Sequence, residues 1–477
     1  MKIFKRIKES FSSKKFRKGA YTTAISIFVI VIIVIINLAA KHLNIKIDLN
    51  KDRKYSLTKQ TKELMKDTSD EIKLYYMTGE ESQDSSVKQI VDQYDGVVKN
   101  IKVERKDPQT YPQFAKKYTE EEVTSNSVIV VNTTNDRSKV VDYNDMFTTE
   151  IDYNTYSEQI TGIDVEGQIT SALEYVTTKD LPKMYQVEGH EELEIPSTLA
   201  NSLAKENITT ENLNTFTADK IPDDCELLLI NGPQHDFTKE EKELIEDYLK
   251  KGGNAIILTS YTTDPMPNFE SILANYGVSI EEGIVVEGDN NHFMSGTPTY
   301  VVPDMNQHDI TSSIIGKRMP IVIPIGRGLQ IADSLESTIT IESLLDSTDK
   351  SYSKVNANSS TYTKEDADIN GPFSLGAAIT DNSQEEPSKI VIYSSSYLLD
   401  DSMVSLTSLG NTDLFLNSIK WITGNKVNLS IPTRSLLPTY LTLNAADVIF
   451  YSALVIIVIP LMILITGAVV TMRRRKK

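Results

Sequence analysis

The sequence predicts an α/β protein whose extracytoplasmic lobe lies between two transmembrane helices. Two observations predict the helices. Residues 19–40 and 448–472 contain no charged side chain, and basic residues lie just outside each run. Apolar runs of about 20 residues are long enough to cross a bilayer core. A third observation predicts the lobe, because short apolar strands alternate with amphipathic helices between the two runs, as in a parallel α/β sheet.

The basic flanks predict the orientation in the cell membrane. Positively charged segments stay in the cytoplasm, so we expect a cytoplasmic basic segment at residues 1–18 and a cytoplasmic basic tail at residues 473–477. Residues 431–447 then link the outer lobe to the second helix. The first run is long for a signal peptide and has no clear cleavage site after it, which favours an uncleaved anchor over a cleaved leader. Two buried core helices are the alternative interpretation of both runs.

Composition excludes several classes of protein. The net charge is −17 and Cys225 is the only cysteine. An acidic lobe repels nucleic acid and anionic lipid headgroups, so its charge indicates either a solvated surface or a cationic partner. A single cysteine excludes a disulfide scaffold. Cys225 precedes its predicted strand instead of lying in the turn after it, and we expect a buried structural residue, not a nucleophile.

Residues 41–150 predict a small α/β domain. Strands are expected at residues 72–77 and 127–131, and residues 83–99 carry apolar side chains at the 3-4 spacing of an amphipathic helix. The order of elements resembles a thioredoxin-like layout. There is no Cys-x-x-Cys motif, which excludes dithiol redox chemistry here.

Residues 151–430 predict a larger α/β domain with a parallel sheet. Its strands are expected at residues 184–187, 226–230 and 255–258, and the second is a near-continuous apolar run, typical of a strand covered on both faces. Thr238 and Glu241 have the spacing of a capping box at the start of a helix.

The later part of this domain is predicted to be less regular. Residues 284–345 have the composition of strands, and we interpret them as a strand-rich insertion. The polar residues 346–370 predict a mobile loop. A final helix at residues 413–422 contains the only tryptophan, Trp421.

The usual motifs of catalysis and metal binding are missing from the sequence. There is no P-loop, no nucleophile elbow and no pair of histidines at zinc-protease spacing, and the five histidines are scattered. We therefore predict no catalytic residues, no metal site and no cofactor.

Loops that follow the predicted parallel strands are the candidates for ligand binding, because ligands of such sheets bind beyond the carboxyl ends of the strands. The candidate residues are His190, Glu191, Asn231, His235 and Asp236. The alternatives are ordinary solvated turns, in which Gly189 and Gly232 supply backbone freedom, and a hydrolase in which His190 and Asp236 act as acid or base.

The chain resembles the GldG family, the auxiliary subunits of ABC transporters of the gliding-motility type. The resemblance rests on short motifs in a fixed order: Tyr55-Ser56-Leu57-Thr58, Val187-Glu188-Gly189-His190-Glu191, residues 227–233, Asn275-Tyr276-Gly277-Val278, Gly371-Pro372-Phe373 and Gly410-Asn411-Thr412-Asp413. It implies that the larger domain is similar to a class I glutamine amidotransferase fold without its enzyme site. It also implies two partners, a membrane permease and a separate cytoplasmic ATPase.

Together these observations predict a non-enzymatic auxiliary subunit of an ABC transporter, whose outer lobe presents or gates a substrate beside the permease. The alternative is a free-standing membrane protein that binds envelope glycan or another surface ligand.

Overall fold

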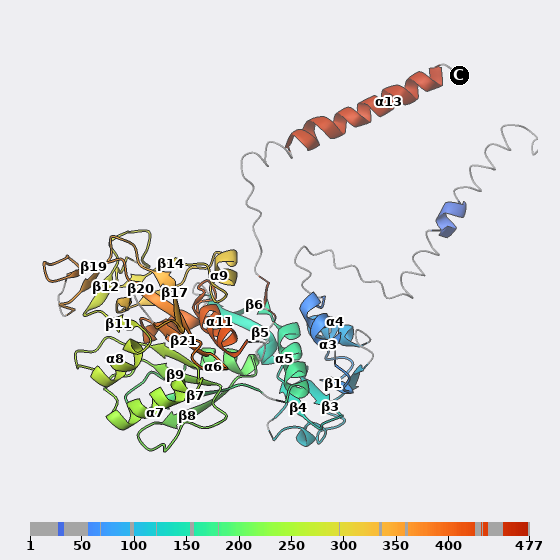
Figure 1. Ribbon diagram of the computed structural model, residues 1–477. Coiled ribbons are helices and arrows are strands. Elements are labelled where there is room, and N and C mark those ends of the chain that lie inside the picture. Colours follow the sequence, from blue (N-terminus) through green and yellow to red (C-terminus); the bar gives the residue numbers. More distant parts are fainter. Residues whose placement is uncertain are drawn as a thin grey trace, which may run out of the picture.

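The computed structural model (Figure 1) describes most of the lobe and short stretches at both ends. The described residues are 27–32, 56–66, 68–95, 100–120, 122–152, 157–179, 181–294, 296–332, 336–357, 361–424, 431, 433–436 and 452–475. The chain forms two lobes, and in the sequence the second lies between two parts of the first. We call residues 56–179 with 431–436 the small lobe, and residues 181–424 the large lobe.

The small lobe is built on a four-stranded sheet in the order β2-β1-β3-β4. Strand β1 (Ile72–Met77) pairs in parallel with β2 (Ile101–Lys106) and antiparallel with β3 (Val128–Asn132), which pairs antiparallel with β4 (Ser138–Val141). One face shares a core with α3 (Lys59–Lys66), α4 (Ser85–Tyr94) and α5 (Val165–Thr177). On the other face Tyr75 packs against the rings of Phe114 and Tyr118.

A second, three-stranded sheet brings a late part of the chain back to the small lobe. Its order is β22-β6-β5, with β5 (Phe147–Asp152) and β6 (Ser157–Ile163) forming an antiparallel pair. Strand β22 (Arg434–Ser435) pairs with β6 so that Arg434 lies opposite Ile163. Residues 434–435, which the sequence placed in a linker, are therefore a strand.

The large lobe contains a ten-stranded mixed sheet. Its parallel half runs β8 (Thr209–Asn214), β7 (Lys183–Glu188), β9 (Leu227–Asn231), β10 (Ala255–Leu258) and β21 (Ser388–Tyr393). Strands β20 (Ser374–Asp381), β16 (Leu329–Ile331) and β11 (Val278–Ile280) continue it in antiparallel order, and β17 (Ile339–Asp346) and β14 (Asp304–Met305) branch from β20. The sequence predicted three neighbouring strands of the parallel half, β7, β9 and β10, but not the edge strand β8, and the antiparallel half corrects the expectation of a purely parallel sheet.

Helices cover both faces of this sheet. Helices α6 (Ser197–Lys205) and α11 (Asn411–Thr423) pack on one face, and α7 (Lys239–Lys250) and α8 (Pro267–Ala274) pack on the other (Figure 1). Along β9, Leu227 and Leu229 belong to the first core while Leu228 and Ile230 belong to the second. Burial on both faces explains why this strand is apolar at nearly every position.

The prediction of a mobile loop at residues 346–370 is partly wrong, because two short strands lie within it. Strand β18 (Tyr352–Lys354) pairs with β12 (Ile284–Val286) and with β19 (Ile369–Asn370) in a small three-stranded sheet. Polar residues of this segment are buried where they form hydrogen bonds and ion pairs with one another. The Nζ atom of Lys354 lies 3.3 Å from the carboxylate of Asp368, which also accepts a hydrogen bond from the backbone of Val355. Residues 358–360 lie outside the described residues.

The two predicted membrane helices are not supported by the described residues. Of residues 19–40, only 27–32 are described, and they are helical. In the second run, a π-helix over Leu454–Val458 precedes α13 (Ile459–Arg475), an α-helix of 17 residues. A span needs about 20 residues in one helix. Within the part of the chain that the structure describes, no helix is both long enough and apolar enough to cross a membrane.

Candidate functional site

The loops after β7, β9 and β10 lie at one edge of the large lobe, because parallel strands that are neighbours in a sheet end on the same side. The first loop begins with Glu188 and Gly189 and contains His190 and Glu191. Gly189 has a φ of 128°, and Glu191 has a φ of 59°. The first value suits glycine alone, whereas the second is the left-handed helical region that other residues adopt at a cost.

His190 is held by two glutamates. Its Nδ1 lies 3.2 Å from Glu192 Oε1, and its Nε2 lies 3.3 Å from Glu241 Oε2. The residue is 6% exposed, and its ring meets the ring of Phe237 edge-on at 4.4 Å. Both ring nitrogens are therefore occupied inside the protein, and the side chain joins the β7 loop to the start of α7.

The charges around His190 favour its protonated form. Burial lowers its pKa, but hydrogen bonds and negative charge from Glu192 and Glu241 outweigh burial and raise the pKa above the ordinary 6.5. For Glu241 burial acts in the opposite direction and raises the pKa, but hydrogen bonds from Thr238 and Thr215 outweigh burial and lower the pKa overall. The arrangement is a buried histidine between two carboxylates, suited to holding a proton in place.

The structure brings two other predicted residues together at the surface. The ring of His235 lies 3.5 Å from Glu191, and their side chains are 57% and 74% exposed. Such an exposed pair contributes little to stability. Asn231 is 1% exposed and donates from Nδ2 to the carbonyl of Leu193 at 2.6 Å, which holds the end of the β7 loop against β9.

Asp236 contacts the first turn of α8. Its carboxylate accepts hydrogen bonds from the backbone N–H groups of Asn268 at 3.1 Å and Phe269 at 2.9 Å. This is the role of a helix cap, in which a carboxylate meets the unpaired N–H groups of a helix start. Asp236 and His190 therefore have separate partners, which argues against their joint use as acid and base.

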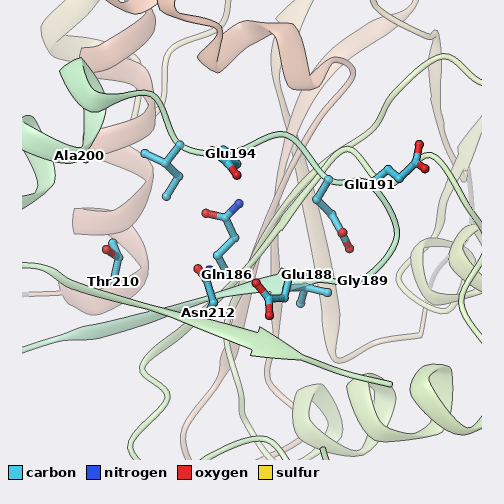
Figure 2. Close-up of a pocket in the computed structure, with 11 residues that line it drawn as sticks. Gln186, Glu188, Gly189, Glu191, Glu194, Ala200, Thr210 and Asn212 are labelled. Atoms are coloured by element: carbon cyan, nitrogen blue, oxygen red, sulfur yellow. The ribbon is translucent and has the colours of Figure 1, made fainter. Parts of the chain in front are cut away.

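A cavity of about 450 Å³ opens beside the β7 loop. It lies between α6, β7 and the edge strand β8, and Figure 2 shows Gln186, Glu188, Glu194 and Asn212 around it. Glu191 and Glu192 also line it. The carboxylate and amide oxygens that line the cavity can accept hydrogen bonds from hydroxyl or ammonium groups. Among the described residues, no group of three or more His, Cys, Asp or Glu side chains is placed to hold a metal ion.

Sequence reasoning missed three residues of this site. Glu192 and Gln186 escaped it because their roles depend on the folded loop: Gln186 donates to the carbonyl of Leu193 at 3.0 Å. Glu241 was recognised only as part of a capping box. The structure adds contacts from its other oxygen to Thr215 at 2.7 Å and from the capping oxygen to His190. The spacing of these residues along the chain carries no signal of either contact.

Cys225 lies outside this edge of the sheet. It is half-buried, and its Sγ lies 3.5 Å from the hydroxyl of Tyr248 on α7. Burial raises the pKa of the thiol to about 11. A thiol in this state is protonated at neutral pH and is a poor nucleophile.

Two family models match the chain. Residues 181–418, which form nearly all of the large lobe, match a family described as an ABC-type uncharacterized transport system. Residues 51–148 match a domain of unknown function, DUF7088. No curated protein matches the chain.

Solved structures give only distant similarity. The mmIFT52 N-terminal domain is 17% identical, covering 52% of this chain and 100% of its own, with a TM-score of 0.38. A putative thua-like protein from Parabacteroides merdae is 12% identical, covering 53% and 94%, with a TM-score of 0.29. A putative GMP synthase component from Thermoplasma acidophilum is 11% identical, covering 52% and 96%, with a TM-score of 0.26. At these scores the matches carry no argument about fold or activity, so the amidotransferase likeness stays a prediction.

Proposed function

We propose that this chain is a non-enzymatic auxiliary subunit of an ABC transporter. Residues 181–418 match a family model for an auxiliary protein of ABC-type transport systems. The family match is the observation that carries the proposal. The geometry agrees with it, since His190, Asn231 and Asp236 all have partners that hold loops and helices together.

The proposal includes a place for the chain in the cell membrane. The uncharged runs at residues 19–40 and 448–472, with their basic flanks, favour two anchors with both chain ends in the cytoplasm. The two lobes are then extracytoplasmic. The ordered motifs favour the GldG type among auxiliary subunits.

Two partners complete the proposed assembly. The sequence has no P-loop, so a transporter that contains this chain needs a separate cytoplasmic ATPase as well as a permease. The acidic outer lobe would present or gate the transported substrate beside the permease.

The test is a pull-down of the tagged full-length chain from its native membrane in mild detergent. Co-eluting proteins are identified and quantified by mass spectrometry, with the untagged strain as the control. We expect a multi-span permease and a P-loop ATPase in near-equal amounts. A chain that elutes without either protein contradicts the proposal.

The cavity beside β7 favours a second function, the binding of an envelope glycan by a free-standing protein. Its amide and carboxylate groups (Gln186, Asn212, Glu188 and Glu194) suit a ligand rich in hydroxyls. We expect Asn212→Leu to lose binding on a glycan array. Glu211→Gln, on the same strand but paired with Lys183 and absent from the cavity lining, should keep it. An array on which the unmodified chain binds nothing would remove this function.

A further inference from the structure

Three stretches that are far apart in the sequence meet at one buried carboxylate. Glu166, in the first turn of α5, is 4% exposed. Its Oε1 accepts hydrogen bonds from the backbone N–H of Thr58 at 2.5 Å and from Thr61 Oγ1 at 2.6 Å. Its Oε2 pairs with the guanidinium group of Arg434. One side chain thus holds the first and the last described segments of the small lobe.

Arg434 also contacts the first segment directly. Its guanidinium donates to the carbonyl of Ser56 at 2.8 Å. The backbone of Arg434 is fixed by pairing with Ile163 of β6, directly before α5. The arginine side chain is 14% exposed, so both partners of the ion pair are shielded from water.

A second ion pair ties the same end of α5 to the large lobe. Asp164 lies 2.7 Å from the Nζ atom of Lys205, the last residue of α6, and their side chains are 5% and 15% exposed. Lys205 also donates to the carbonyl of Ile431 at 3.4 Å. Lys205 therefore contacts both the start of α5 and the last segment of the small lobe.

We propose that Glu166, Thr58, Thr61 and Arg434 form a latch that joins the two membrane-proximal segments and couples their separation to α5. The inference rests on the proposed function, in which residues 56–58 and 434–436 are the described parts of the lobes nearest to the two anchors. A buried carboxylate that loses its partners is strongly disfavoured. The latch therefore has two discrete states, closed around Glu166 or open to water, and such bistable elements carry conformational signals.

Hydrogen exchange on the purified full-length chain tests the latch. In Arg434→Gln, we expect exchange about tenfold faster at residues 56–66 and 431–436, because local opening follows the loss of buried contacts. Exchange in β9 and β10 should stay unchanged. The control is Lys317→Gln, which removes an ion pair to Asp413 whose side chains are 46% and 33% exposed. We expect this control to resemble the unmodified chain.

Two outcomes would overturn the latch: unchanged exchange at residues 56–66 in Arg434→Gln, or equally faster exchange throughout β9 and β10. A milder variant covers the case in which Arg434→Gln does not fold. Thr61→Val removes one hydrogen bond to Glu166 and leaves every charge in place. Faster exchange at residues 56–66 is expected, and no change there would overturn the latch.

The coupling is tested in the purified transporter, with exchange at α5 compared with and without ATP. Arg434→Gln should keep the permease and ATPase bound but lose the nucleotide-dependent change at α5. Retention of that change would overturn the coupling. Failure to find transporter partners would instead contradict the proposed function, and the exchange experiment on the isolated chain would still decide the latch.

Discussion

At the scale of single residues, His190 shows that a residue chosen as a ligand-binding candidate also has structural partners in the fold. The sequence places it after a parallel strand, where ligands bind. The fold surrounds it with Glu192, Glu241 and Phe237, and it is buried. The sequence predicted that His190 follows a parallel strand. It did not predict these contacts, because Phe237 and Glu241 lie about fifty residues later, at the start of α7.

We expect His190 to stabilise the fold in a pH-dependent way. Burial lowers its pKa, but Glu192 and Glu241 raise it above 6.5 overall, so the folded state binds the proton more tightly than the unfolded state. The stabilisation is complete below the unfolded pKa and is lost as pH rises through the folded pKa. In urea unfolding at pH 6, His190→Gln should cost about 2 kcal/mol, the value of hydrogen bonds to charged groups.

The same pair of proteins at pH 9 supplies the check on this sign. The difference in free energy of unfolding between the unmodified chain and His190→Gln should be smaller at pH 9 than at pH 6. A difference that grows with pH would show that the neutral ring is the stabilising form. His235→Gln, at an exposed position, is the control and should change stability little at either pH.

At the scale of elements, local signals predicted best. The capping box at the start of α7 is confirmed: Glu241 N donates to Thr238 Oγ1 at 3.2 Å, and Thr238 N donates to Glu241 Oε2 at 2.9 Å. The helix at residues 413–422 is confirmed as part of α11. Strands β18 and β19, within residues 346–370, were missed, because a lysine such as Lys354 is typical of an exposed loop and its buried partner Asp368 is found only in the fold.

Removal of this cap should be measurable. Thr238→Ala leaves the N–H of Glu241 without its acceptor, and we expect a loss of about 1 kcal/mol in urea unfolding. Lys239→Ala, one residue later at an exposed position, should stay within about 0.5 kcal/mol of the unmodified chain. Equal losses in both variants would mean that the cap contributes nothing specific.

At the scale of the whole molecule, contacts between the lobes were outside the reach of sequence reasoning. Lys139 on β4 donates to the carbonyl of Ala204 at 3.1 Å and to Asn207 Oδ1 at 2.6 Å, at the end of α6. No pattern in the sequence relates these residues, since their pairing depends on how two separately folded sheets are placed. The α/β character of each lobe was predictable, and the antiparallel half of the large sheet was not.

Lys139 gives this contact a pH signature. Burial lowers its pKa to about 8, against the charges of Glu174 and Glu206, while an unfolded lysine keeps a pKa near 10.5. Between these values the unfolded state binds more protons, so the contribution of Lys139 to stability rises with pH. Unfolding measured at pH 8 and pH 10 should show the unmodified chain gaining relative to Lys139→Met. A gain by the variant between pH 8 and pH 10 would contradict the lowered pKa of Lys139 in the folded state.

The pairing of β22 with β6 has a consequence for how the polypeptide tolerates damage. The large lobe is in effect an insertion within the small one, because the chain leaves the small lobe after α5 and returns to it at Arg434. A premature stop after Gly424 would spare every strand of the ten-stranded sheet. It would remove Arg434 and leave Glu166 buried without its cation. A truncation near the end of the gene would therefore damage the half of the protein that is translated first.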